Sequence, residues 1–489
     1  MKMKTAHSRS TESIRSTRSI STIVLAGVVL FLPAAYATPP ARSAETTTHP
    51  NWQELARRSH GAGFSILPLL AIEKALETPT PTAAEQTRLI RMATRLSAHT
   101  GTGIAAMALS EKITNEDQIA DWQWFSGLAN LKKGDSKVAA EHFRRVRKTN
   151  RNFSRARYQL ALMAYNEKRN AEAEAGFKEI LASKPSPDSE LQDLTKLALG
   201  RIWYEQKKFQ SAAAAYRTVS RGGPQFKTAL FEQSWALFMA GFPNHALGAI
   251  HGIESPFFRD SFNPEATLLR SIILYWMCMY SDSDRALQEF IARHADPIDR
   301  LDSFLARQQL TPDAAWDLFE NMIAGVSSES LGIPRPVLMT AASSDRMIPL
   351  RTALAQATLE INKVEQGKFS TGSNAQDQAA KNLLRDHLRS LRVSTGKQFV
   401  IALEDLRSQY EQLRAQADFL YLELLTSEKD KLLGKEHLAS NKFSAKQANG
   451  KRPAGWGKSQ LAWAPNTKQE YWWDEVGFYV DPAKSACAK

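Results

Sequence analysis

Side chains suited to catalysis or metal binding are few and scattered in this sequence of 489 residues. Its two cysteines, Cys278 and Cys487, form no Cys-x-x-Cys pair, and its ten histidines show no His-Glu-x-x-His spacing. Residues 393–398 (VSTGKQ) hold a Gly-Lys pair but lack the upstream glycine of a phosphate-binding loop. Asp474 and Glu475 have the chemistry of an acid–base pair, but adjacent carboxylates on an aromatic tail are more simply salt-bridge or capping groups. We therefore expect no enzyme, no metal and no cofactor.

The charge of the chain is basic but not concentrated. Lysine and arginine together number 63 against 51 acidic residues, which gives a formal net charge of +12. These basic residues do not gather on one strip interleaved with aromatic residues, as a nucleic-acid groove requires. We expect proteins or peptides, and not nucleic acid, as partners.

The first 37 residues have the pattern of an export signal. Residues 1–19 carry five basic residues and one acidic residue, residues 20–37 are apolar, and the segment ends in Ala35-Tyr36-Ala37. This pattern predicts a secretory signal peptide that is cleaved before Thr38. The alternative is an uncleaved membrane anchor, but the apolar run is shorter than the ~20 residues a spanning helix needs and contains Pro33. We favour cleavage, expect no transmembrane span after it, and expect residues 38–50 to be disordered.

A helix-turn-helix unit repeats along residues 119–296. Ala139 and Phe143 recur 34 residues later as Ala173 and Phe177, and further copies follow. The period and the small and aromatic positions resemble the tetratricopeptide repeat, in which two helices pack through these residues. The expected packing residues are Gly127, Ala139, Phe143, Ala161, Ala173, Phe177, Gly200, Ala212, Tyr216, Ala246, Ala286 and Phe290.

The resemblance implies a superhelical solenoid with a concave groove that binds proteins or peptides. Polar or aromatic residues of the first helices that are not packing positions are the candidates for its surface: Arg157, Lys196, Tyr204 and Gln233. The alternative for each is an ordinary solvated helix face. Residues 51–118 read as degenerate helical repeats or a cap, because a solenoid must hide its last apolar face.

The C-terminal half has a different sequence pattern. Residues 297–345 predict short helices and a connector, and residues 346–436 predict a long helical hairpin. Apolar residues from Phe399 to Leu424 keep the spacing of a coiled-coil seam. The partner of that seam is either the helix at 349–366 folded back, which we favour, or a second copy of the chain.

Residues 437–489 read as a linker followed by a tail rich in aromatic residues. We expect the tail to dock on the last repeats through its rings, namely Tyr471, Trp472, Trp473, Phe478 and Tyr479. An exported chain with two cysteines also suggests a disulfide between Cys278 and Cys487. The alternative is two unrelated thiols, one buried and one free.

The tail and the helix that ends in YWMCMYSDSDRA resemble a group of envelope tetratricopeptide proteins of gliding and predatory Gram-negative bacteria. This resemblance implies a periplasmic or cell-envelope location. The sequence therefore predicts an all-α protein: a solenoid, a hairpin and an irregular tail. Its expected function is an exported, non-catalytic scaffold or adaptor that binds envelope proteins, and the alternative is a polysaccharide- or peptidoglycan-binding protein. The sequence leaves the oligomeric state open.

Overall fold

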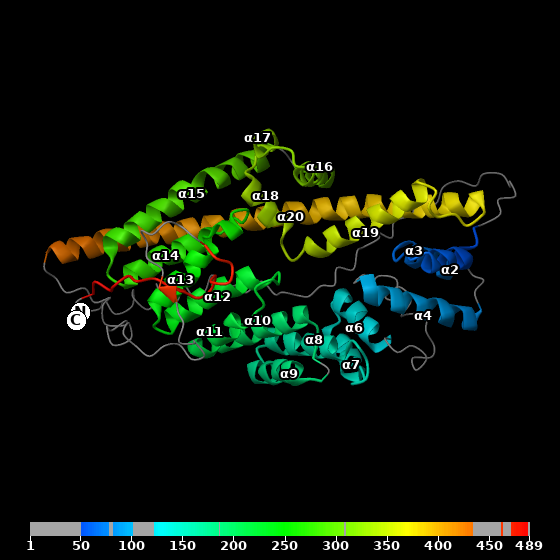
Figure 1. Ribbon diagram of the computed structural model, residues 1–489, viewed down its shortest axis with the longest axis horizontal. Helices are drawn as coiled ribbons and strands as arrows, with labels where there is room; N and C mark the ends of the chain where they lie inside the picture. Colours follow the sequence, from blue (N-terminus) through cyan, green and yellow to red (C-terminus); the bar gives the residue numbers. More distant parts are fainter. Residues whose placement is uncertain are drawn as a thin grey trace.

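A computed structural model describes residues 50–77, 82–100, 122–184, 186–307, 310–433, 461–462 and 471–487. The predicted signal peptide and most of the predicted linker lie outside this part of the chain. Most of the described residues are helical and very few are in strands (Figure 1), and the predicted all-α solenoid is confirmed. Within these residues, none of the helices combines the length and the apolar character needed to cross a membrane.

Five helical pairs form the solenoid. They are α6 (Trp122–Lys133) with α7 (Ser136–Arg145), α8 (Phe153–Asn166) with α9 (Asn170–Ala182), α10 (Ser189–Glu205) with α11 (Phe209–Arg217), α12 (Phe226–Met239) with α13 (Pro243–Ile253), and α14 (Pro264–Trp276) with α15 (Tyr280–Arg307). Small residues let each pair close. A Cβ at Gly127 would lie 2.4 Å from the Phe143 ring, and one at Gly200 would lie 2.4 Å from the Tyr216 ring. The repeat is therefore encoded by close packing.

The turn inside each pair has one residue in the left-handed region. Gly134 and Gly241 take it in the first and fourth pairs, with φ of 88° and 85°. Lys168 and Lys207 take it in the second and third, with φ of 63° and 61°. In the fifth pair the residue is Cys278, with φ of 57°. Cys278 thus occupies the left-handed turn position that recurs in all five helical pairs.

This turn also fixes the register of the fifth repeat. Ser271 and Ser283 take the small facing positions there, because the Ser271 hydroxyl donates to the Ser283 carbonyl oxygen at 2.7 Å. Ala286 and Phe290, which the sequence pattern places at the packing positions, are both buried but lie three residues further along α15. In the fifth repeat, the position of the turn therefore decides which residues face one another, and these are not the residues that the sequence pattern predicts.

The long helix α20 (Asn374–Leu432) runs the length of the molecule (Figure 1). The helix α19 (Ile348–Glu365) folds back on it, with Arg385 and Glu365 paired at 2.7 Å near the turn. Further along, α20 contacts α16 (Pro312–Ile323), α18 (Arg335–Ala342), α15 and α14, and α16 also contacts the short α17 (Ser328–Leu331).

The apolar seam of α20 has a different partner from the one expected. Its residue Tyr410 stacks on Phe290 of α15 with 5.8 Å between ring centroids, and Phe399 meets Phe319 of α16 at 5.5 Å. The reason is the length of α19. Its 18 residues span about 27 Å, so α19 lies along the first part of α20 and is too short to reach the seam. The seam is thus covered by the last repeat and the connector helices.

The N-terminal helices α2 (Trp52–Gly61) and α3 (Leu67–Glu77) pack at the hairpin, and α3 also contacts α4 (Ala83–Thr100). The buried Glu360 of α19 accepts hydrogen bonds from the backbone N–H groups of Ser65, Ile66 and Leu67, at 2.7–2.9 Å. This carboxylate caps the start of α3, where the N–H groups have no partner within the helix. Phe64 also contacts Phe369 in the hairpin turn, so these helices join the hairpin directly.

Candidate functional site

Polar contacts join consecutive first helices of the solenoid. The Tyr165 hydroxyl of α8 donates to Glu205 Oε1 of α10 at 2.6 Å. The Arg201 guanidinium of α10 donates to the Glu232 carboxylate of α12, with Nη2 and Oε1 2.7 Å apart. These contacts mark the side of the solenoid on which the first helices lie next to one another.

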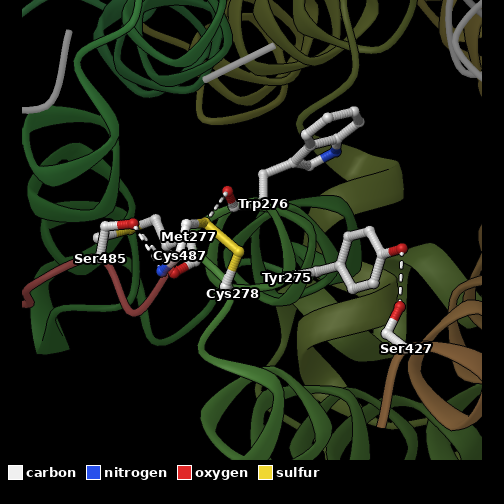
Figure 2. Close-up of a disulfide and its surroundings, with 7 residues drawn as sticks. All are labelled: Tyr275, Trp276, Met277, Cys278, Ser427, Ser485 and Cys487. Atoms are coloured by element: carbon white, nitrogen blue, oxygen red, sulfur yellow. Dashed lines mark hydrogen bonds between the residues drawn. A yellow bond between two sulfur atoms is a disulfide. The ribbon is translucent and has the colours of Figure 1, made fainter. Parts of the chain in front are cut away.

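The fifth repeat shows what this side can hold. Tyr275, at the end of α14, occupies the position that Tyr165 and Tyr204 hold at the ends of α8 and α10. Its hydroxyl lies 3.2 Å from Ser427 Oγ of α20 (Figure 2). The same hydroxyl lies 3.2 Å from Oε2 of Glu423, also on α20. A helix of the same chain therefore packs against this position in the last repeat.

In the preceding repeats the same side is half-buried. We call it the inner face and define it by Leu131, Leu162, Tyr165, Arg201, Tyr204, Phe231 and Trp235. It is largely apolar and aromatic, and its one arginine is neutralised by an acid. Such a composition suits a partly apolar segment of another protein.

The electrostatics of the inner face centre on Arg201. Burial alone would lower the pKa of Arg201, but the Glu232 carboxylate raises it above its ordinary value. Burial raises the pKa of Asp345, which lies in the connector between α18 and α19. The positive charge of Arg201 opposes this rise.

Of the four groove residues expected from the sequence, only Tyr204 lies on the inner face, where its ring meets Phe209 at 5.2 Å. Lys196 is held on another side of α10, where its Nζ donates to the Thr218 carbonyl oxygen at 2.9 Å. Arg157 holds the equivalent place on α8, with its guanidinium 4.9 Å from the Phe153 ring. Gln233 is 2% exposed, which leaves no surface for a partner.

A tyrosine recurs in the last turn of successive first helices, and this was the signal that sequence reasoning missed. Tyr165 and Tyr204 each lie three residues before the left-handed residue of the following turn, which is Lys168 in one repeat and Lys207 in the other. Tyr275 also lies three residues before the left-handed residue of its turn, which is Cys278. This equivalence is visible when the repeats are aligned on the turn, and not when they are aligned on the packing alanine.

The C-terminal tail docks on α13. A Cβ at Gly248 would lie 1.9 Å from the Tyr479 carbonyl oxygen, and one at Gly252 would lie 3.2 Å from the Val476 side chain. The Asn244 side chain donates to the carbonyl oxygens of Asp481 and Ala483, at 2.7 and 2.6 Å. A helix face of small residues thus admits the tail backbone. The tail also contains β2 (Tyr479–Val480), which pairs in parallel with β1 (Leu461–Ala462).

The rings of the tail take different roles. Tyr471 stacks on His251 with centroids 4.8 Å apart, and Tyr479 meets the same imidazole edge-on at 5.3 Å. Trp473 lies against Phe226 at 5.6 Å, yet remains 39% exposed. The Phe478 ring lies under the Arg221 guanidinium at 4.4 Å. Trp472 is 60% exposed and so faces solvent.

The two cysteines meet at the end of α14. The sulfur atoms of Cys278 and Cys487 are 2.08 Å apart, at disulfide-bond distance (Figure 2). Ser485 Oγ and the Ala486 backbone N–H both donate to the Met277 carbonyl oxygen, at 3.2 and 2.8 Å. The residues before Cys487 are therefore held in place by the end of α14.

The glycine of the segment that resembles part of a phosphate-binding loop has a structural role. Gly396 of the VSTGKQ segment lies within α20, where a Cβ would come within 1.8 Å of the Pro312 carbonyl oxygen of α16. Its role is close helix packing, and a helix interior offers no loop to cradle phosphate. Among the described residues, no cluster of three His, Cys, Asp or Glu side chains is arranged to hold a metal ion.

Comparison with protein families identifies the repeats. A tetratricopeptide repeat model matches residues 126–189 and 197–242, which cover most of α6 to α12. These segments are tetratricopeptide repeats, a module that generally binds other proteins. No curated protein matches the chain.

Proposed function

We propose that this protein is an exported scaffold or adaptor of the cell envelope, and that it binds segments of other proteins on its inner face. The observation that supports this most is the contact of Tyr275 with α20. In the fifth repeat, a helix packs against this tyrosine position. Tyr165 and Tyr204 hold the equivalent position in the second and third repeats, where they are half-buried. A helix from a partner would extend the same mode of packing.

The proposed location rests on the sequence of residues 1–37 and on the cysteine pair. A disulfide between Cys278 and Cys487 is stable in an oxidising compartment such as the periplasm. The likeness of the tail to envelope tetratricopeptide proteins of gliding and predatory bacteria supports the same location. Cell fractionation with N-terminal sequencing of the mature chain tests it: a start at Thr38 in the envelope fraction agrees, and an unprocessed cytoplasmic chain contradicts it.

A purified-component experiment tests the binding surface. The full mature chain is immobilised beside a Leu162→Glu/Tyr204→Ala variant and a control variant at the exposed Glu179 of α9, Glu179→Ala. Envelope proteins retained by the wild type and the control, and released from the inner-face variant, agree with the proposal. Equal retention by all three chains would place the binding surface elsewhere.

One observation favours the polysaccharide alternative: the Trp472 and Trp473 side chains are 60% and 39% exposed, and the Trp473 ring lies 5.2 Å from the ring of Phe257, which is 46% exposed. Aromatic faces of this kind can stack on sugar rings. Sedimentation with purified sacculi distinguishes the two functions. Cosedimentation that is lost in a Trp472→Ala/Trp473→Ala variant favours the polysaccharide, and a chain that stays in the supernatant favours the scaffold.

A further inference from the structure

The last part of α20 carries a second stripe of residues that no helix of the described chain covers. Its members follow the alternating spacing of three and four residues typical of a coiled-coil seam. They are Ala415, Asp418, Leu422, Leu425, Lys429 and Leu432, and all six are exposed. Leu422 is 61% exposed, Leu425 47% and Leu432 88%.

This stripe is distinct from the seam that holds α20 to the solenoid. The buried residues of the same segment, such as Tyr410, Ala417 and Leu424, lie on another side of the helix and pack within the main core. In Figure 1 the C-terminal end of α20 projects beyond α14 and α15. Leu422 and Leu425 are neighbours on this stripe, and exposed apolar residues that cluster mark interaction surfaces.

We propose that this stripe pairs with the same stripe of a second copy of the chain, in an antiparallel two-helix contact. With the two-fold axis between residues 423 and 424, Leu422 faces Leu425 of the other copy. The same register places Ala415 opposite Leu432, and Asp418 opposite Lys429, at both ends of the contact. The six residues span about 26 Å of helix, roughly two and a half heptads.

The charged residues of the stripe indicate which partner it pairs with and in which direction the two helices run. In an antiparallel pair the two charged members of the stripe, Asp418 and Lys429, meet as opposite charges twice. A parallel pair in register would set Asp418 against Asp418 and Lys429 against Lys429, and like charges at a seam oppose association. The stripe is thus complementary to itself in one orientation, which is the requirement for a two-fold symmetric interface.

Charge reversal with mixing tests this inference. The mature chain, Asp418→Lys, Lys429→Asp and an equimolar mixture of the two variants are compared by sedimentation velocity and light scattering. Glu404→Lys, at an exposed position three turns before Ala415 on α20, controls for the change of net charge. Circular dichroism checks that each variant keeps its helix content.

The wild type and Glu404→Lys are expected to be dimers. Each reversal alone is expected to weaken dimerisation about tenfold or more, because it sets like charges against each other at both ends. The mixture should recover the dimer, because one chain of the mixed pair then carries lysine at both charged positions and the other carries aspartate at both. A wild type that stays monomeric at all concentrations would overturn the inference, as would single variants that dimerise normally or a mixture that fails to recover.

Discussion

The carbonyl oxygen of Tyr479 occupies the space that a side chain at Gly248 would need, only 1.9 Å from the position of its Cβ. The tail backbone therefore rests directly on α13. Gly248→Ala should displace the tail and lower the free energy of unfolding by about 1–3 kcal/mol, the usual cost of overpacking. Hydrogen exchange of residues 471–487 and chemical denaturation measure the two effects. Gly222→Ala, where a Cβ meets nothing within 4 Å, is the control and should change neither.

The disulfide should contribute strongly to stability, because it joins residues 209 positions apart in sequence. Reduction, or Cys487→Ser, is expected to lower the free energy of unfolding by about 2–4 kcal/mol. Alkylation of the native, non-reduced protein followed by intact-mass measurement checks the bond itself. The expected mass carries no label before reduction and two labels after it. Two labels without reduction would mean that the thiols are free.

Glu360 should hold the N-terminal helices to the hairpin. Glu360→Ala leaves the N–H groups of Ser65, Ile66 and Leu67 without their buried acceptor, which should cost about 3 kcal/mol. Thermal unfolding with limited proteolysis near residues 50–77 would detect early release of α2 and α3. Glu365→Ala, which removes an exposed partner of Arg385, serves as the control and should cost less than about 1 kcal/mol.

Acid should loosen the tail through His251. Burial, and then the nearby Arg270, lower the pKa of His251 to about 4, below the ~6.5 of the unfolded chain. Between these values the unfolded state binds a proton that the folded state does not, so stability is complete above about pH 6.5 and falls toward about pH 4. His251→Phe should flatten this fall by up to about 1.4 kcal/mol per pH unit. An unchanged pH profile of unfolding would contradict the assignment.

The helical pairs and the docked tail could be predicted because they depend on residues with few alternatives. Gly127 and Phe143 fit one another only at the close approach of two helices, so their recurrence predicts the pair. The rings of Tyr471 and Trp473 needed an apolar surface, and α13 with its neighbours supplies it.

The register of the fifth repeat and the covering of α20 could not be predicted in the same way. Ala286 and Phe290 match the pattern, but the hydrogen bond between Ser271 and Ser283 selects another register. The apolar seam around Tyr410 predicts that this side of the helix is buried, but it does not predict which helix covers it. Such choices depend on distances between segments far apart in the sequence. Lys196 shows the same limit, because its acceptor at Thr218 exists only once α10 and α11 are packed.

Site-specific photocrosslinking in intact cells tests the proposed binding function most directly. A photoreactive aromatic residue replaces Tyr204 on the inner face, and the control position is the exposed Glu179 of α9. Position 204 should give a discrete crosslinked protein that position 179 does not give. Crosslinks at 179 alone, or none at 204 in cells that contain the folded chain, would contradict a partner-binding inner face.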